Sequence, residues 1–283
     1  MDRGTRLASM VPAHTRIAFI GGGNMASAIL GGLLKQGLPA ASVQVVEPWD
    51  EARERLARDF GVKAQAQAGP SLADATVVVW AVKPQTFREA AQAVAPHGRN
   101  ALHLSVAAGI RSDGIRQWLG TDRIVRSMPN TPALVGRGMT ALFARPGVSA
   151  DDRALVEQVL APTGSTLWID AEQQLDAVTA LSGSGPAYVF YFIEAMTRAG
   201  QEMGLPAATA QQLAIGTFCG ASELARASSD PPSVLRERVT SKGGTTYAAL
   251  TSMQQSGVAD KFVEAMQAAC RRAAELGDEF GRG

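Results

Sequence analysis

The stretch RIAFIGGGNMA at Arg16–Ala26 decides the fold of this 283-residue chain. A β-rich run leads into three glycines, and residues 24–36 then show the apolar spacing of a helix. In such a strand–turn–helix, Gly21 permits a tight turn, Gly23 lets a pyrophosphate approach the backbone, and Ala26 allows close packing of helix on sheet. The pattern G-x-G-x-x-A in this setting predicts a dinucleotide-binding fold.

The alternation of strand and helix signals continues along the first half of the chain. Residues 51–60 form a charged amphipathic helix, and further strands are predicted at 43–47, 76–82, 101–106, 123–127, 139–144 and 166–169. The run 76–82 is almost entirely apolar, as expected for a parallel strand that is buried on both faces. We therefore predict an α/β fold with a Rossmann-type, doubly wound parallel sheet.

The second half of the chain has a different pattern, because strand signals stop after about Asp170. Long helices are predicted at 186–203 and 207–227, and a last helix carries one apolar stripe, formed by Phe262, Met266, Ala269, Ala273 and Leu276. Apolar helices in so short a domain predict burial against a second subunit. The expected organisation is a flexible extension at 1–15, a dinucleotide-binding Rossmann domain at 16–170, and a helical dimerisation and substrate domain at 171–283.

Composition excludes several classes of function. A net charge of +1 gives no basic footprint for nucleic acid or an anionic membrane, and the apolar runs are too short to span a bilayer. The first 15 residues lack the apolar core of a signal peptide, which predicts a cytoplasmic protein. His14, His97 and His103 show no metal-ligand spacing, so no metal is expected, and Cys219 and Cys270 make no disulfide framework.

Cofactor contacts are expected at the carboxyl ends of the strands, where open α/β sheets bind ligands. Glu47 ends the second strand, where an acid accepts hydrogen bonds from the ribose of NAD; a solvent-facing strand end is the alternative. Arg53 and Arg55 could offset repulsion of a 2′-phosphate, so NADPH and NADH both stay open as cofactors. For Lys83, a cofactor-side structural role is favoured over catalysis or a surface charge. The predicted cofactor-binding residues are Gly21, Gly22, Gly23, Asn24, Met25, Glu47, Ala81, Val82, Lys83, Pro84, Ala107 and Asn130.

A second informative segment is VTSKGGTT at 239–246, which precedes an apolar stretch. Thr246 is expected in the first turn or at the N-cap of a helix, and the glycines allow backbone conformations closed to other residues. Such a helix start offers free N–H groups and a hydroxyl, which suits a small carboxylate. An ordinary helix cap is the alternative for this segment taken alone.

Together these motifs resemble pyrroline-5-carboxylate reductase, from Ile17 to about Ala274. The segments that carry the resemblance are IGGGNMA at 20–26, AVKPQ at 81–85, MPNTPALVGRG at 128–138, LSGSGPAYVF at 181–190 and VTSKGGTTYAAL at 239–250. The resemblance implies NADPH- or NADH-dependent reduction of the cyclic imine 1-pyrroline-5-carboxylate to L-proline, the last step of proline synthesis. It also implies that helical domains interlock in a homodimer, and that such dimers often assemble into a decamer.

The same resemblance implies the substrate site. The N–H groups of Gly244 and Thr245, with the Ser241 hydroxyl and the turn at Gly243, would hold the substrate carboxylate, and Thr246 would act as the catalytic residue by hydrogen-bonding the ring nitrogen. Ser182 to Gly185 would form a small-residue turn near the nicotinamide, with helix packing as the alternative. Two positions depart from the family pattern: Lys242 replaces the usual Pro, and Glu47 stands where Ser, Asn or a nearby Arg is common.

Two other functions stay open from the residues alone. A β-hydroxyacid dehydrogenase shares the layout but relies on a lysine of the helical domain, for which Lys242 or Lys261 is the candidate. A non-catalytic dinucleotide sensor is the other possibility. The retained Gly243–Gly244 pair and Thr246 argue against a sensor, because a sensor has no need of an imine site.

Overall fold

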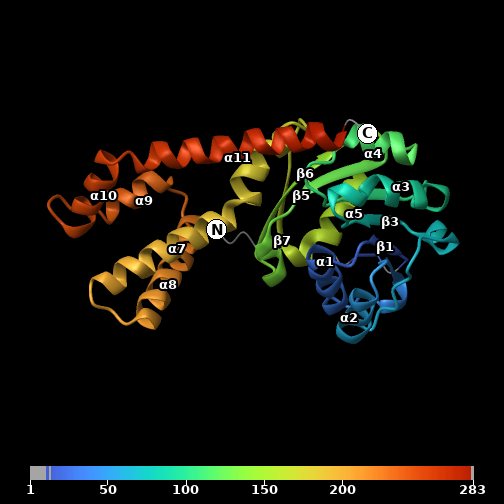
Figure 1. Cartoon of the computed structure of the whole chain (residues 1–283), viewed down its shortest axis with the longest axis horizontal. Coiled ribbons are helices and arrows are strands. Elements are labelled where there is room, and N and C mark those ends of the chain that lie inside the picture. Colours follow the sequence, from blue (N-terminus) through green and yellow to red (C-terminus); the bar gives the residue numbers. More distant parts are fainter. Residues whose placement is uncertain (1–10, 13, 282–283) are drawn as a thin grey trace. The chain divides into compact units, whose positions relative to one another are not determined.

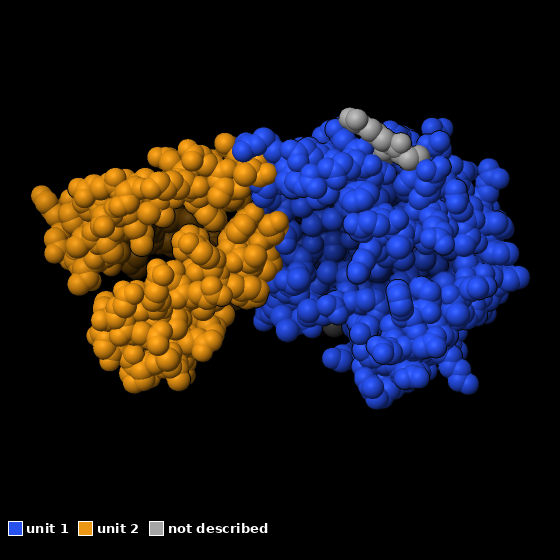
Figure 2. Space-filling view, viewed as in Figure 1, with its two compact units in different colours: residues 1–183, 269–283 blue, residues 184–268 orange. Residues whose placement is uncertain are grey.

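The structure, a computed structural model, describes residues 11, 12 and 14–281. Most of the flexible extension predicted for residues 1–15 lies outside the described residues, although Val11 packs against the hydrophobic core. The described chain forms two compact units: residues up to Gly183 together with those from Ala269 onward, and Ser184–Ala268 (Figure 2). This division places residues 171–183 and the end of the chain with the sheet, whereas the predicted domain boundary lies at 170/171.

Within the described residues, the first unit contains a single β-sheet. Its strands are β1 (Ile17–Ile20), β2 (Val43–Val46), β3 (Val77–Trp80), β4 (Leu102–Ser105), β5 (Ile124–Met128), β6 (Gly138–Ala144) and β7 (Gly164–Trp168). They lie in the order β2-β1-β3-β4-β5-β6-β7, and β1 to β5 run parallel. Strand order reverses at β1, which pairs with β2 on one side and β3 on the other. The carboxyl ends of β1 and β3 therefore form the crevice where this class of sheet binds ligands.

The sheet is mostly parallel, as predicted, and the last two strands run in the opposite direction. β6 pairs antiparallel with β5, with Val125 opposite Ala144, and β7 runs parallel to β6. A parallel pair needs a crossover of a dozen or more residues, whereas residues 129–137 between β5 and β6 hold only the 3-10 turn η3 (Thr131–Val135). The chain therefore turns back on itself at this point.

Helices cover both faces of the sheet, as the ribbon shows (Figure 1). They are α1 (Asn24–Lys35), α2 (Asp50–Phe60), α3 (Pro84–Gly98), α4 (Ser112–Leu119), α5 (Ala150–Leu160) and α6 (Gln174–Val178), with 3-10 turns η1 (Ala40–Ser42), η2 (Pro70–Asp74) and η4 (Ala161–Thr163). Alternate strand residues make two cores: Phe19 and Val79 face α1 and α5, whereas Ala18 and Trp80 face α3 and α4. A β-strand points successive side chains to opposite faces, so continuous apolar runs are buried on both sides.

The second unit is helical within the described residues. It contains α7 (Gly185–Glu202), α8 (Ala207–Ala227), α9 (Pro232–Arg238), α10 (Thr245–Gln255) and the start of α11 (Val258–Gly281). Close packing of α7 on α8 depends on Gly200, where a Cβ would lie 2.8 Å from the Cβ of Ala210. Phe192 packs edge-on against Phe262, with ring centroids 5.6 Å apart. Apolar side chains nevertheless stay exposed on these helices, among them Val189, Phe190, Tyr191, Leu213, Ile215 and Leu224.

Candidate active site

The glycine turn at the end of β1 can be formed only by glycine. Gly21 has φ +94°, and a Cβ on it would lie 2.6 Å from the carbonyl oxygen of Ala81. Its N–H donates to the Val46 carbonyl over 2.8 Å, which ties the turn to β2. The backbone of the turn therefore passes directly over the end of β3, as a dinucleotide fold requires.

The start of α1 leaves space and donors for an anion. Gly23 is its extended N-cap and supplies no side-chain cap, so the first N–H groups of the helix, from Asn24 and Met25 onward, lack intrahelical acceptors. No atom lies within 4 Å of the position that a Cβ on Gly23 would take. A pyrophosphate fits such an open helix start, because the N–H groups and the helix dipole both favour negative charge.

Glu47 is fixed against the glycine turn. Its side chain is 6% exposed, so the alternative of a solvent-facing strand end is wrong. One carboxylate oxygen accepts a hydrogen bond of 2.7 Å from the N–H of Gly22, and the other accepts one of 3.0 Å from the N–H of Trp49. The carboxylate thus lies at the place where a Rossmann fold receives the adenosine ribose.

The other predicted cofactor residues follow β3 and β4 at the same edge. Ala81 donates from its N–H to the Ile20 carbonyl over 2.8 Å, and Lys83 is the exposed N-cap of α3, with Pro84 as the first residue of that helix. Ala107 is buried and donates from its N–H to the Ser105 hydroxyl over 3.3 Å. The fold brings these residues to one edge, and their contact with a cofactor stays a prediction.

Asn130 uses both ends of its side-chain amide within the protein. Its amide nitrogen donates to the Ser182 carbonyl over 3.0 Å, and its oxygen accepts from the N–H of Met139 over 2.9 Å. Ser182 lies in the π-helix η5 (Thr179–Gly183), which continues α6. Nearby, a Cβ on Gly183 would lie 2.5 Å from the end of the Met128 side chain. Asn130 therefore positions this segment, and a cofactor contact of its side chain stays a prediction.

The predicted substrate loop is a glycine turn that leads into α10. Gly243 has φ +76°, and the N–H of Gly244 donates to the Ser241 carbonyl over 3.0 Å. A Cβ on Gly244 would lie 2.6 Å from the Ser241 hydroxyl oxygen, so a larger residue there would force the Ser241 side chain to turn away. α10 begins at Thr245, with Gly244 as an N-cap that supplies no side-chain hydrogen bond. The expectation that Thr246 lies in the first helical turn is confirmed.

The Thr246 hydroxyl differs from its neighbours. Thr240 and Thr251 donate their hydroxyls to the carbonyls of Arg236 and Tyr247, four residues earlier. Thr246 lies too near the helix start for such a bond, and among the described residues its hydroxyl has no hydrogen-bond partner. A ligand can therefore use both the hydroxyl and the first N–H groups of α10.

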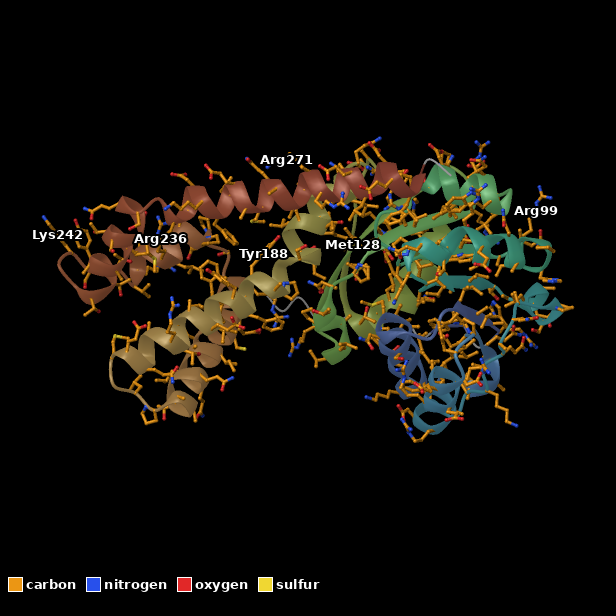
Figure 3. The ribbon with its side chains drawn as sticks, viewed as in Figure 1. Arg99, Met128, Tyr188, Arg236, Lys242 and Arg271 are labelled. Carbon is orange, nitrogen blue, oxygen red and sulfur yellow. The ribbon has the colours of Figure 1, made fainter. Side chains whose placement is uncertain are left out.

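A hollow of about 420 Å³ lies beside this loop, and Thr240 and Lys242 of the loop line it. Its other lining residues are Arg236, Glu237, Tyr247, Leu250, Thr251 and Gln254 (Arg236 and Lys242 are labelled in Figure 3). None of the predicted substrate residues lines it, so this hollow is not the expected carboxylate site. The substrate loop lies in the second unit and the cofactor edge in the first.

A network of ion pairs supports the segment that Asn130 positions. Arg126 on β5 is 5% exposed and lies 2.6 Å from Glu172, which also accepts from the N–H and hydroxyl of Ser112. Burial alone would raise the pKa of Glu172, but Arg126 and Ser112 together lower it below its usual value. Arg111 pairs with Asp176 on α6 through two hydrogen bonds. The sequence does not predict this network, because no local pattern pairs residues so far apart in the chain.

His103 belongs to the buried core of β4. It is fully buried, its Nδ1 accepts from the Trp80 indole N–H over 3.1 Å, and burial lowers its pKa from 6.5 to about 4. Within residues 11, 12 and 14–281, no cluster of three or more His, Cys, Asp or Glu side chains could hold a metal ion. No helix of that same part of the chain combines the length and apolarity needed to cross a bilayer.

Sequence relatives decide the family. A pyrroline-5-carboxylate reductase of Pseudomonas aeruginosa is 45% identical over 269 residues, which are 94% of this chain and 98% of the relative. The chain belongs to the pyrroline-5-carboxylate reductase family. A second relative of that name, from Haemophilus influenzae, is 41% identical over 93% of this chain and 98% of its own length. The resemblance read from the sequence motifs is confirmed.

Family models and solved structures agree on the fold of this reductase family member. A model described as pyrroline-5-carboxylate reductase dimerisation matches residues 172–276, and one described as NADP oxidoreductase, coenzyme F420-dependent, matches residues 16–109. The pyrroline-5-carboxylate reductase structure from Coxiella burnetii is 35% identical, with a TM-score of 0.86 over 93% of this chain and 98% of that one. A Plasmodium falciparum pyrroline carboxylate reductase with NADP bound is 26% identical, with a TM-score of 0.83 over 95% of this chain and all of that one. The predicted Rossmann fold followed by a helical dimerisation region is confirmed.

Proposed function

We propose that this protein catalyses the last step of proline synthesis, the reduction of 1-pyrroline-5-carboxylate to L-proline. Membership of the family makes it an NAD(P)H-dependent oxidoreductase that acts on a CH–NH group. The observation that carries the proposal is the helix start at Thr245, which offers uncapped N–H groups beside a Thr246 hydroxyl without a partner in the described chain. These are the groups that an imine with an adjacent carboxylate needs.

The chain's part in the reaction is binding and orientation. The N–H groups at the start of α10, from Thr245 onward, and the Ser241 hydroxyl hold the substrate carboxylate, in the turn that Gly243 makes possible. The predicted contribution of the Gly244 N–H is not retained, because that group donates to the Ser241 carbonyl. The Thr246 hydroxyl hydrogen-bonds the ring nitrogen, fixes its position and relays its proton. A protonated imine already accepts hydride well, so no strongly basic catalytic residue is required. Orientation of two bound reactants can itself lower the barrier by roughly 7–11 kcal/mol.

The cofactor edge fits NAD(P)H, with three kinds of contact. The open start of α1 at Asn24 and Met25 receives the pyrophosphate, and Glu47 receives the adenosine ribose. The segment Ala81–Pro84 and the main chain at Ala107 border the crevice on the β3 and β4 side. When bound, NAD(P)H supplies the hydride that adds to the imine carbon.

The working form of the protein is an interlocked homodimer, and a decamer of such dimers is its expected assembly. Supporting this, the matched dimerisation region begins at residue 172, next to the predicted domain limit at 170/171. The exposed side chains of Phe190 (59%), Tyr191 (69%) and Leu213 (55%) give the helical unit an apolar surface that a second copy would cover. We expect no nucleic-acid or membrane partner and a cytoplasmic location.

One assay separates the candidate functions. The oxidation of NADH and NADPH is followed with 1-pyrroline-5-carboxylate, and then with a panel of 3-oxoacids. The proposal expects turnover with the imine alone, with L-proline as the product. Turnover of 3-oxoacids that is lost in Lys242→Gln or Lys261→Gln would instead establish the dehydrogenase, and cofactor binding without any turnover would establish a sensor.

A further inference from the structure

We infer that this reductase selects NADH over NADPH, and that Glu47 is the residue that discriminates between them. The inference rests on the proposed function only in naming the reaction, since the selection is made at the adenosine end of the cofactor. It comes from the surroundings of one carboxylate and of two arginines on α2.

The Glu47 carboxylate cannot turn away from the site. Hydrogen bonds from the N–H groups of Gly22 (2.7 Å) and Trp49 (3.0 Å) hold one oxygen each, and the side chain is 6% exposed. An ionised carboxylate has about four acceptor positions, so each oxygen keeps capacity for a further donor. The two hydroxyls of an unmodified adenosine ribose are such donors.

A 2′-phosphate offers the opposite chemistry at the same place. Phosphate oxygens are acceptors, as carboxylate oxygens are, so the two groups cannot hydrogen-bond while both are ionised. Their charges repel most strongly where water is excluded, and Glu47 is buried. To bind NADPH, the site would have to supply a cation that outweighs Glu47.

The nearest cations in the sequence are already held by the protein. Arg53 donates to the carbonyls of Glu47 (2.9 Å) and Pro48 (2.7 Å) and pairs with Asp50. Arg55 donates to the Gly22 carbonyl over 2.8 Å, which stabilises the glycine turn itself. Moving either guanidinium to a phosphate would leave main-chain carbonyls without their donors.

The start of α2 adds to the same preference. A helix N-terminus next to the ribose could attract a 2′-phosphate, but the first turn of α2 carries Asp50 and Glu51. These acids occupy the favourable position near the helix N-terminus and repel a further anion. The carboxylate, the held arginines and the acidic helix start therefore all favour a free ribose.

Direct binding tests the inference without any turnover. NADH and NADPH are titrated separately into the full-length protein by calorimetry, with no imine present, and adenosine 5′-monophosphate and adenosine 2′,5′-bisphosphate are then compared as competitors. We expect NADH to bind at least tenfold more tightly than NADPH, and the monophosphate to compete better than the bisphosphate. Equal affinities, or tighter binding of NADPH, would overturn the inference whatever the variants do.

Variants then assign the selection to Glu47. Glu47→Gln keeps the shape of the side chain and removes its charge. It should reduce the preference for NADH over NADPH at least tenfold, mostly because NADPH binds better. Glu54→Gln is the matched control, since it removes a charge from an exposed position on the same helix. If the ratio of NADH to NADPH affinity changes equally in both variants, the overall charge of the helix sets the preference and Glu47 does not. Selective NADH binding in a protein that leaves the imine unreduced would refute the proposed function and leave this inference standing.

Discussion

The side-chain amide of Asn130 donates a hydrogen bond of 3.0 Å to the main-chain carbonyl of Ser182, which lies 52 residues later in the chain. The bond joins the turn after β5 to the π-helix η5, and π-helices are frequent at functional sites. Two of the motifs that carry the family resemblance are thereby held in one arrangement.

Asn130→Ala should leave the Ser182 carbonyl and the Met139 N–H without partners. We expect a loss of about 1–3 kcal/mol in the free energy of unfolding, measured by urea denaturation. Asn130→Asp keeps an acceptor for Met139 and should recover part of the loss. A variant as stable as the wild type, with an unchanged kcat/KM, would contradict the positioning role.

Thr246→Ala should remove one hydrogen bond to a charged ring nitrogen. The transition state should be destabilised by about 1.5–3 kcal/mol, which is roughly a 10- to 150-fold loss in kcat/KM. Because the cofactor edge is untouched, the Kd for NADH should stay unchanged. Thr246→Ser retains the hydroxyl and serves as the control; an alanine variant with full kcat/KM would rule out the assignment.

Glu172→Gln should leave the buried Arg126 guanidinium without its charge partner. Breaking a buried ion pair by removing one partner costs about 3–5 kcal/mol, and we expect a loss toward the lower end because Ser112 keeps an acceptor. The matched control is Glu275→Gln, which breaks the exposed pair with Arg272 and should not change stability measurably. Urea denaturation of both variants makes the comparison, and equal stabilities would show that the buried pair contributes nothing.

His103 should make stability depend on pH between about 6.5 and 4. Its pKa is lowered to about 4 in the folded state, so in this window the unfolded chain binds more protons and the free energy of unfolding falls as the pH falls. The full effect is on the order of 3 kcal/mol at pH 4. His103→Gln keeps an acceptor for Trp80 but does not titrate, and stability curves of the two proteins should diverge below pH 6.5. If the two curves of stability against pH stay parallel, protonation of His103 does not lower the free energy of unfolding.

Phe190→Asp should prevent dimer formation. Phe190 is 59% exposed on α7, whereas Phe192 on the same helix packs against Phe262 within the chain and is a poorer test. Burial of such surface between subunits contributes roughly 25 cal/mol per Å², so a charge there should yield inactive monomer or aggregate by light scattering. Phe190→Leu, which stays apolar, should remain dimeric. An active monomer at assay concentration would refute the interlocked dimer.

The sequence by itself determined the succession of strands and helices along the chain and the place of the cofactor turn. Those features depend on neighbours along the chain: apolar runs of strand length, helical spacing, and glycines that alone accept the backbone at Gly21 and Gly243. The helix starts at Asn24 and Thr245 were predictable for the same reason. The cofactor contacts were predicted from the glycine pattern and the strand ends, and the substrate contacts from the family resemblance. Both sets of contacts stay predictions.

Only the tertiary structure decided which distant groups meet. β6 reverses direction because its partner is β5, Asn130 meets Ser182, and Arg126 meets Glu172. Glu47 left two alternatives open in the sequence, since a strand end is exposed or buried according to what packs over it. The Gly22 and Trp49 N–H groups settle its orientation, because a buried carboxylate must find donors and the fold supplies them there.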